Sequence, residues 1–397
     1  MKGKRVIIIA ALVFLSPCIY SDSSVLQGYI QRFISADLTA KADILREASS
    51  NNAFTESAEF YGYALQFVLN SYAQMENTRG MNNIVNISVN ALRKTQPRLT
   101  ASDLDTLWRL SLEYPDSYVK AEILVTLGVV GKGNRSLINN INMYLTEKCL
   151  SYRLGTVVDY VLVSACISAI MELNDSSSYS ALFTAVCAGF PEVIASEAYG
   201  ALELINGNLY QFLMNVIENN SPEEKFAAFM TGINSERLTL SQRGRLAELA
   251  LEQAFTATVS SDEDTVDLTA MRYASVLALT SLRWTRANAL AIRHYYRVQA
   301  DYLHNTVAKD RLIEAIACLG AVGNSDAALT LGLQLGLINA RTESTGSFDA
   351  EITMAIVQAL GLIGYHAAFD HLLNVGNLAY GDDIHAAARE AIDRLRW

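Results

Sequence analysis

The phrases LGVVG (127–131), LGAVG (319–323) and LGLIG (360–364) decide the fold of this 397-residue chain. A phosphate-binding glycine loop follows a β-strand and leads into a helix, whereas each of these phrases lies between two runs of helical apolar spacing. None of the three is closed by the Lys-Ser or Lys-Thr pair of a nucleotide-binding loop. The phrases therefore indicate turns between paired helices, and we expect no nucleotide and no other small-molecule cofactor.

The two glycines of each phrase have different predicted roles. The first lies inside the helical pattern, where the missing side chain lets a neighbouring helix approach closely. The second follows the last apolar residue and is expected to end the helix in left-handed backbone, which glycine adopts without strain. The predicted repeat turns are Gly131, Gly323 and Gly364.

The phrase recurs with a period near 40 residues. Leu319 and Leu360 are 41 residues apart, and Leu127 and Ile170, in a weaker copy, are 43 apart. Such a period, built from paired helices, is typical of a solenoid. Only five prolines occur and 51% of the residues are hydrophobic, which also favours long helices. We predict an all-α fold, an α-solenoid of paired antiparallel helices.

Three segments resemble the HEAT repeat, particularly the short bacterial kind of phycobilisome lyase-like proteins. Small residues such as Ala121 and Ala315 precede the phrase, Lys120 lies seven residues ahead of it, and a polar cap follows. The Asp-Pro pair that usually follows the turn in this family is missing from every copy. The resemblance implies a HEAT/armadillo-like fold and does not imply lyase activity. The three segments are 117–145, 308–335 and 349–375.

The chain divides into four predicted segments. The acidic stretch VSSDEDTVD (259–267) has no apolar periodicity and is predicted to be a loop that breaks the array, with TESTGS (342–347) as a second loop. The segments are a signal peptide at 1–23, a helical capping region at 24–115, HEAT-like repeats at 116–260, and further HEAT-like repeats with a C-terminal cap at 267–397.

The first residues have the pattern of an export signal. A basic start precedes VIIIAALVFL (6–15), an apolar run too short to span a bilayer. Two processing routes stay open. Cys18 resembles the acylated cysteine of a lipoprotein, although Pro17 departs from the usual small residue, and cleavage near Ser21 or Ser23 would instead leave a soluble protein. We expect an exported, periplasmic or envelope-associated protein that contacts the membrane only through such a lipid anchor.

Charge argues against nucleic acid as a partner, because the formal net charge is −10 and phosphate binding rests on Lys and Arg. One segment is nevertheless rich in basic and aromatic residues, the types that most often anchor interfaces. The alternative is that its aromatic residues pack between repeats while its arginines pair with nearby acids. The candidate partner-binding residues are Arg283, Trp284, Arg286, His294, Tyr295, Tyr296, Arg297 and Tyr302, with His304 beside them.

No catalytic or metal-binding constellation is predicted. His366 and Asp370 are four residues apart and His371 follows, but no HExxH motif supports a metal site, and the GxSxG form of a serine nucleophile is absent. The cysteines lie in apolar helical sequence and are interpreted as buried packing residues, with disulfide formation left open. They are Cys149, Cys166, Cys187 and Cys318.

These observations favour an exported, non-enzymatic HEAT-repeat scaffold that binds a protein or cell-envelope partner on its curved face. Two alternatives stay open. One is a secreted α/α-toroid enzyme acting on glycans, which would need aromatic residues and paired carboxylates at the open ends of its inner helices. The chain has only three tryptophans to form such a sugar platform. The other is a structural or assembly role as an envelope lipoprotein.

Overall fold

The computed structural model describes residues 24–51, 54, 57–75 and 78–396. The predicted signal segment 1–23, with Cys18, lies outside the described residues. Within the described ranges every regular element is helical, apart from an isolated β-bridge between Tyr365 and Arg396. The predicted all-α fold is therefore confirmed. No helix in this part of the chain combines the length and the apolar composition needed to cross a membrane.

The helices form two compact units, which we describe separately. The first contains the described residues up to Ser178 together with Pro191–Leu204, and the second contains Tyr179–Phe190 and the described residues from Ile205 onward. The expected break at 259–267 is not a boundary between them, because it falls inside the second unit.

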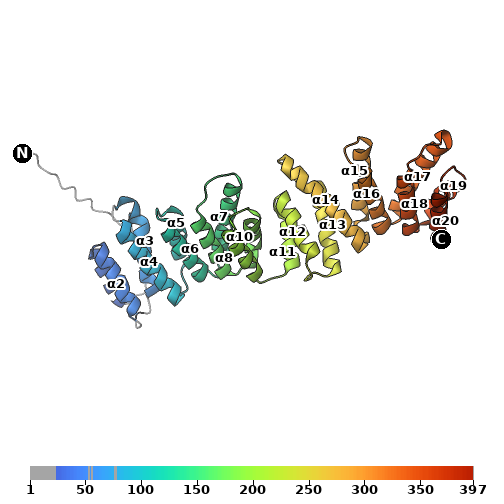
Figure 1. The fold of residues 1–397 in the computed structure, drawn as a ribbon. Coiled ribbons are helices and arrows are strands. Elements are labelled where there is room, and N and C mark those ends of the chain that lie inside the picture. Colours follow the sequence, from blue (N-terminus) through green and yellow to red (C-terminus); the bar gives the residue numbers. More distant parts are fainter. Residues whose placement is uncertain (1–23, 52–53, 55–56, 76–77, 397) are drawn as a thin grey trace, which may run out of the picture. The chain divides into compact units, whose positions relative to one another are not determined.

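The first unit is built from two layers of helices (Figure 1). Helices α2, α4, α6, α8 and α10 each pack on the next, while α1, α3 and α5 form a second row and α7 lies against α8. The bounds are α1 (Ser24–Ser35), α2 (Leu38–Ser50), α3 (Ser57–Ser71), α4 (Thr78–Thr95), α5 (Ala101–Glu113), α6 (Ser117–Val130), α7 (Arg135–Arg153), α8 (Tyr160–Leu173) and α10 (Glu192–Leu204).

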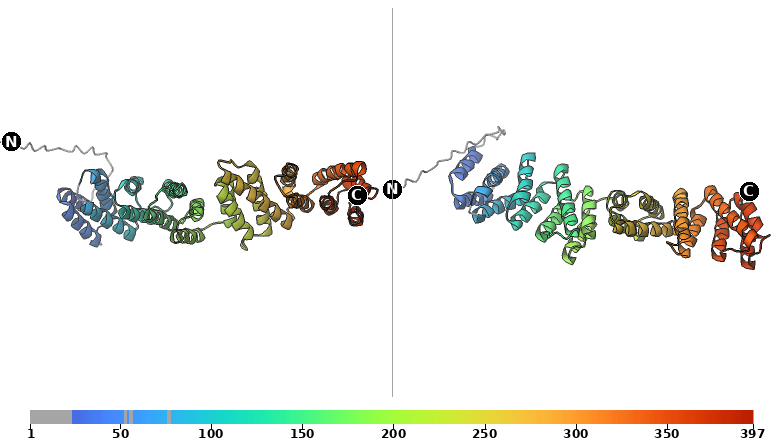
Figure 2. Two further views of the ribbon diagram at one scale, coloured as in Figure 1. Left: turned by 45° about the horizontal axis from the view of Figure 1, so that its top comes forward. Right: turned by 90° about the horizontal axis from the view of Figure 1, so that it is seen from above.

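The second unit repeats this arrangement. Helices α12, α14, α16, α18 and α20 pack in succession, α11, α13, α15, α17 and α19 form the other row, and α9 packs on α11 and α12. Figure 2 shows the helices of this unit from two further directions. The bounds are α9 (Tyr179–Cys187), α11 (Leu209–Asn219), α12 (Pro222–Asn234), α13 (Leu240–Thr256), α14 (Asp262–Leu282), α15 (Asn288–Leu303), α16 (Lys309–Val322), α17 (Ser325–Thr345), α18 (Ala350–Ile363), α19 (Phe369–Val375) and α20 (Asp382–Asp393). Each unit is thus a stack of helix pairs, the arrangement of an α-solenoid.

The first glycine of each phrase is the point where successive helices of one row meet most closely. A Cβ atom at Gly128 in α6 would lie 2.6 Å from the Cα atom of Ala169 in α8, and one at Gly320 in α16 would lie 3.0 Å from the Cα atom of Ala359 in α18. Gly361 of α18 approaches α20 in the same way. Because the contacts involve backbone atoms, a larger residue would force the helices apart.

The second glycine of each phrase follows the last residue of its helix and donates its N–H to the carbonyl of the leucine that opens the phrase. The expected left-handed backbone is found at Gly364, where φ is 67°, but the prediction is wrong for Gly131 and Gly323, whose φ angles are −93° and −72°. At those two positions glycine is required because a side chain would collide with neighbouring atoms. A Cβ atom would lie 2.3 Å from Cδ2 of Leu137 at Gly131, and 2.6 Å from the Cβ atom of Ala327 at Gly323.

Both predicted loops are shorter than expected. Helix α14 begins at Asp262, because Ser261 and Asp264 form a capping box in which each side chain accepts a hydrogen bond from the other residue's backbone N–H. The acidic residues that suggested a loop occupy the first turn of this helix, where the helix dipole favours them. Helix α17 continues to Thr345 and ends at Gly346, which has a left-handed φ of 67°.

Candidate binding groove and the predicted cluster

The predicted basic and aromatic cluster begins at the turn between α14 and α15, where Trp284 packs against α13. Its indole Nε1 donates a hydrogen bond of 2.7 Å to Glu248. A Cβ atom at Gly244 would lie 2.4 Å from the indole ring, so the missing side chain leaves room for it. Trp284 therefore holds two neighbouring helix pairs together.

The cluster's arginines lie at the surface, and two of them pair with acids. Arg286 approaches Glu248 at 3.8 Å, and Arg297 Nε donates to Asp301 at 3.2 Å. Arg283 is exposed at the C-terminal cap of α14. These ion pairs agree with the alternative interpretation of the cluster, in which its arginines pair with nearby acids.

His294 and Tyr295 are each only 1% exposed, so they cannot contact a partner at the surface, and their assignment to the binding cluster is corrected. The ring of His294 meets Tyr273 edge-on with centroids 5.6 Å apart, and neither imidazole nitrogen has a hydrogen-bond partner among the described residues. Burial lowers the pKa of His294 to about 3, with a further contribution from the charge of Arg272. The imidazole is a neutral packing group at neutral pH.

The remaining members of the cluster differ in their exposure. Tyr296 is 51% exposed, Tyr302 is partly buried, and His304 Nδ1 lies 2.7 Å from the carbonyl oxygen of Ala300 in its own helix. The cluster thus contains packing residues, three arginines of which two form ion pairs, and exposed side chains, and partner binding by its exposed members stays a prediction.

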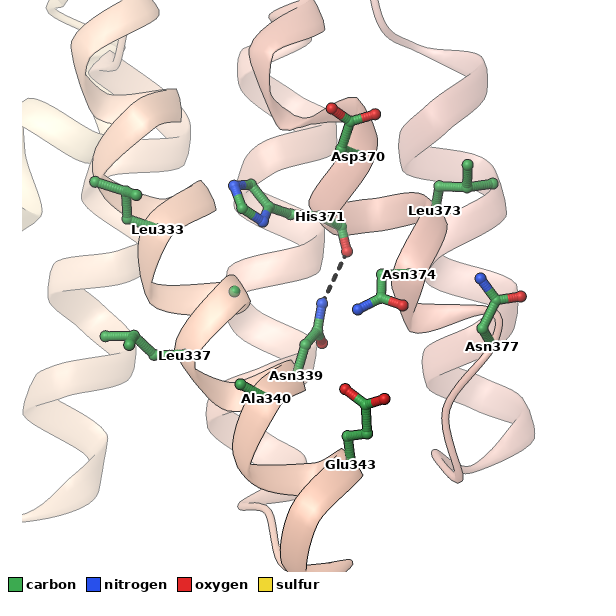
Figure 3. Close-up of a pocket in the computed structure, with 11 residues that line it drawn as sticks. Leu333, Leu337, Asn339, Ala340, Glu343, Asp370, His371, Leu373, Asn374 and Asn377 are labelled. Carbon is green, nitrogen blue, oxygen red and sulfur yellow. Dashed lines mark hydrogen bonds between the residues drawn. The ribbon is translucent and has the colours of Figure 1, made fainter.

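A groove of about 830 Å³ lies elsewhere in the second unit, between α17 and α19 (Figure 3). Its apolar lining includes Leu333 and Leu337 from α17 and Leu373 from α19, which are 64%, 68% and 50% exposed. Exposed leucines concentrated along one groove are unusual on a soluble surface and mark candidate interaction sites. The polar lining residues are Asn339, Glu343, Asp370, His371, Asn374 and Asn377.

Two glycines let α19 come close to α17. A Cβ atom at Gly332 would lie 3.2 Å from Cδ2 of His371, and one at Gly336 would lie 3.0 Å from Cε1 and Nδ1 of the same ring. The imidazole therefore rests on the glycine face of α17. This contact sets the width of the groove at its centre, where Figure 3 shows His371 between the two helices.

A buried polar network fixes the two helices beneath the groove. Asn339 Nδ2 donates to the carbonyl oxygen of His371 at 3.0 Å, drawn as the dashed line in Figure 3, and its Oδ1 accepts from the Tyr380 hydroxyl at 2.8 Å. The hydroxyl oxygen of Tyr380 lies 3.1 Å from that of Thr342. Satisfied buried networks of this kind rigidify their surroundings. The groove is accordingly a preformed feature of the fold.

The sequence carries a signal for this groove that the repeat alignment does not use. In LTLGLQLGL (329–337) leucine occupies every second position. On a helix this spacing cannot place all the leucines on one face. Leu331 and Leu335 are buried, whereas Leu329, Leu333 and Leu337 form an exposed row four residues apart. Alternating apolar residues inside a helical segment therefore predict an unpartnered apolar face.

The histidines and cysteines considered in the sequence analysis as possible metal ligands or disulfide partners lie as follows. No group of three or more His, Cys, Asp or Glu side chains there is arranged to hold a metal ion. His366 lies in a short 3₁₀ turn (His366–Ala368) ahead of α19, so it does not share a regular α-helical face with Asp370. Cys149, Cys166 and Cys318 are buried and Cys187 is partly buried.

Comparison with known proteins gives no family. No protein-family model matches the chain, and a search of curated proteins finds no match. One solved structure that it resembles comes from work on a conserved phosphorylation switch controlling the interaction between cadherin and beta-catenin. That chain is 12% identical, with a TM-score of 0.33 over 95% of this chain and 97% of the other. We draw no functional conclusion from this similarity, and the assignment as an α-solenoid rests on the helix packing described above.

Proposed function

We propose that this chain is a non-enzymatic, HEAT-like scaffold whose groove between α17 and α19 binds an apolar segment of a partner protein. The observation that supports this most directly is the exposure of Leu333, Leu337 and Leu373 around one preformed depression. A helical partner segment with apolar residues three or four positions apart would match the row on α17.

The charge of the groove indicates the flanking chemistry of that segment. Glu343 and Asp370 line it and are exposed, and neither forms an ion pair within the described residues. The only side chain in the lining that can carry a positive charge is His371. Together with the net charge of −10, this favours a segment that carries Lys or Arg beside its apolar residues.

The leucines alone do not provide a stable complex. Fully burying one leucine is worth about 1.5–3 kcal/mol, so completing the burial of these three, which are 64%, 68% and 50% exposed, gives roughly 3–5 kcal/mol. Association costs at least about 4 kcal/mol in lost freedom. The amides of Asn374, which is partly buried, and Asn377, which is exposed, would supply further contacts, and the expected affinity is moderate.

A photo-crosslinking amino acid placed at Leu337 of the full chain, expressed in its native host, would capture the partner. Purified partner would then be titrated against the wild-type chain, Leu337→Asp and Leu362→Asp. Leu362 is the matched control, because it is 59% exposed on α18 and does not line the groove. We expect Leu337→Asp to weaken binding at least tenfold and Leu362→Asp to leave it unchanged. Equal effects of the two variants, or none, would refute the groove as the site.

Export is part of the proposal and rests on the sequence alone. The basic start and the apolar run at 6–15 support secretion to the periplasm or envelope, with Cys18 as the candidate lipidation site. Mass spectrometry of the mature N-terminus in the native host distinguishes an acylated Cys18 from cleavage near Ser21 or Ser23. An intact Met1 on the mature protein would contradict export by either route.

A further inference from the structure

A second cavity in the second unit has a different chemistry from the groove. It has a volume of about 300 Å³ and lies where the end of α13, the link 257–261 and the start of α14 face α15. Three of its lining residues are arginines, Arg272 from α14 with Arg293 and Arg297 from α15, and no acidic residue lines it. This concentration of positive charge stands out in a chain of net charge −10.

Arg272 is the innermost of the three. Its side chain is 9% exposed, and its nearest carboxylate oxygen, on Asp301, is 4.0 Å away. Its guanidinium lies over the ring of Tyr273, 5.0 Å from the centroid, and makes no hydrogen bond to the described residues. Burial lowers the pKa of Arg272, and the charge of Arg297 acts in the same direction. A buried guanidinium with all its N–H groups unused has donors to offer a ligand.

The other two arginines of the cavity add positive charge beside Arg272, and few acids balance it. Arg297 shares Asp301 with Arg272, through a hydrogen bond of 3.2 Å. Arg293 forms no ion pair within the described residues and stacks over Phe255, with its guanidinium carbon 4.4 Å from the ring centroid. Among the described residues, one carboxylate, Asp301, thus lies within ion-pair distance of two of the three guanidinium groups, and none lies within that distance of Arg293. Arg272 is buried whereas Arg293 and Arg297 are exposed, and an anion bound between them would offset the repulsion of the three like charges.

The walls of the cavity add an apolar component. Phe255, Val259 and Leu268 line it, and Thr265 and Thr269 contribute the only hydroxyl groups. Arginine forks match the oxygen geometry of carboxylate and phosphate groups and bind them through paired hydrogen bonds. The apolar wall beside them suits the hydrocarbon body to which such a group is attached.

We propose that this cavity, which we call the arginine pocket, binds one oxyanion, a carboxylate or a phosphate monoester, carried on a small aromatic or aliphatic body. Arg272 and Arg293 donate to the oxygens, Arg297 supplies charge at the rim, and Phe255 covers the body. The pocket is separate from the groove between α17 and α19 and does not depend on the function proposed for it.

Calorimetric titration of the full chain with phenyl phosphate, benzoate and inorganic phosphate tests the proposal. We expect saturable binding of phenyl phosphate or benzoate at one site, and the stronger of the two identifies the oxyanion. Inorganic phosphate, which has no apolar body, is expected to bind at least tenfold more weakly than phenyl phosphate. Failure of both aromatic anions to bind would overturn the proposal, and equal binding of inorganic and phenyl phosphate would overturn the role of the apolar wall.

Substitutions locate the site. Arg293→Gln should weaken binding at least tenfold, and Arg293→Lys should recover only part of the loss because it restores the charge without the fork. The matched control is Arg311→Gln, which removes a nearby charge from over Tyr273 but does not line the pocket. Equal losses in Arg293→Gln and Arg311→Gln would show general charge attraction and refute a site. Leu337→Asp should leave anion binding unchanged, so the outcomes for groove and pocket are separable.

Discussion

Replacing Gly128 with alanine tests the packing that joins successive helix pairs. The added Cβ atom would lie 2.6 Å from Cα and 2.8 Å from the carbonyl oxygen of Ala169, where ordinary contact begins at 3.4 Å. Helices α6 and α8 would have to separate by about 0.8 Å, because backbone atoms cannot rotate out of the way. Overpacking of this kind costs about 1–3 kcal/mol, and alanine returns up to about 1 kcal/mol of helix propensity. We expect a net loss of about 1–2 kcal/mol.

Urea unfolding followed by far-UV circular dichroism measures this loss as a lower midpoint. The matched control is Gly200→Ala, in α10 of the same unit, where an added Cβ atom meets nothing within 4 Å. That variant should be stabilised by up to about 1 kcal/mol, since only helix propensity changes. Gly320→Ala, with its closest contacts at 3.0 Å, should fall between the two. If Gly128→Ala were as stable as Gly200→Ala, the account of close helix contact would be refuted.

Three further predictions test other parts of the fold. Gly364→Ala should lower the free energy of unfolding by about 1–2 kcal/mol through left-handed backbone strain, and by more through contact of the added Cβ atom with a backbone oxygen at 3.0 Å. Gly346→Ala has the same φ of 67° and open space around it, so it should show only the loss from strain. Thermal melts of the two variants measure the difference. His294 stays neutral in the fold because burial lowers its pKa to about 3, whereas in the unfolded chain the imidazole has its ordinary pKa of 6.5 and is protonated below that pH. The free energy of unfolding should therefore fall by about 2 kcal/mol from pH 7 to pH 5, and His294→Phe should abolish that dependence. An unchanged pH profile in His294→Phe would contradict this. Trp284→Phe should cost about 1–3 kcal/mol by removing the hydrogen bond to Glu248, measured by urea unfolding.

The sequence predicts the helix pairs well because the repeated phrase marks two local features, a close approach to the neighbouring helix at its first glycine and the end of the helix at its second. The close approaches of Gly128 and Gly320 are visible as glycines at fixed helical spacing. What the phrase does not encode is the backbone conformation of the second glycine. A side chain at Gly323 would meet the carbonyl oxygen of Leu319 at 2.2 Å and the Cβ atom of Ala327 in the next helix at 2.6 Å, so its own turn and the following helix both exclude it.

The candidate sites were harder to predict, for a related reason. Basic and aromatic composition pointed to the segment around Trp284, but whether such a side chain faces solvent depends on the neighbouring helix, and Gly244 makes room for Trp284 inside. Arg272 and Arg293 come from different helices and are 21 residues apart in sequence, so no linear motif joins them. Only the alternating leucines of α17 gave a local signal for the groove.

Both proposed sites use helices that are longer than the repeat requires. Helices α14 and α17 have 21 residues each, whereas α16 and α18, which carry the glycine phrase, have 14. Seven extra residues add about 10 Å of helix. The early turns of α14 provide Thr265 and Leu268 to the arginine pocket, and the late turns of α17 provide Asn339 and Glu343 to the groove. The late turns of α17 also carry Asn339 and Thr342 of the buried network, so they serve both the packing of α19 and the lining of the groove. The additional turns of α14 and α17 thus supply lining residues to both proposed sites, which α15 and α19, with 16 and 7 residues, complete.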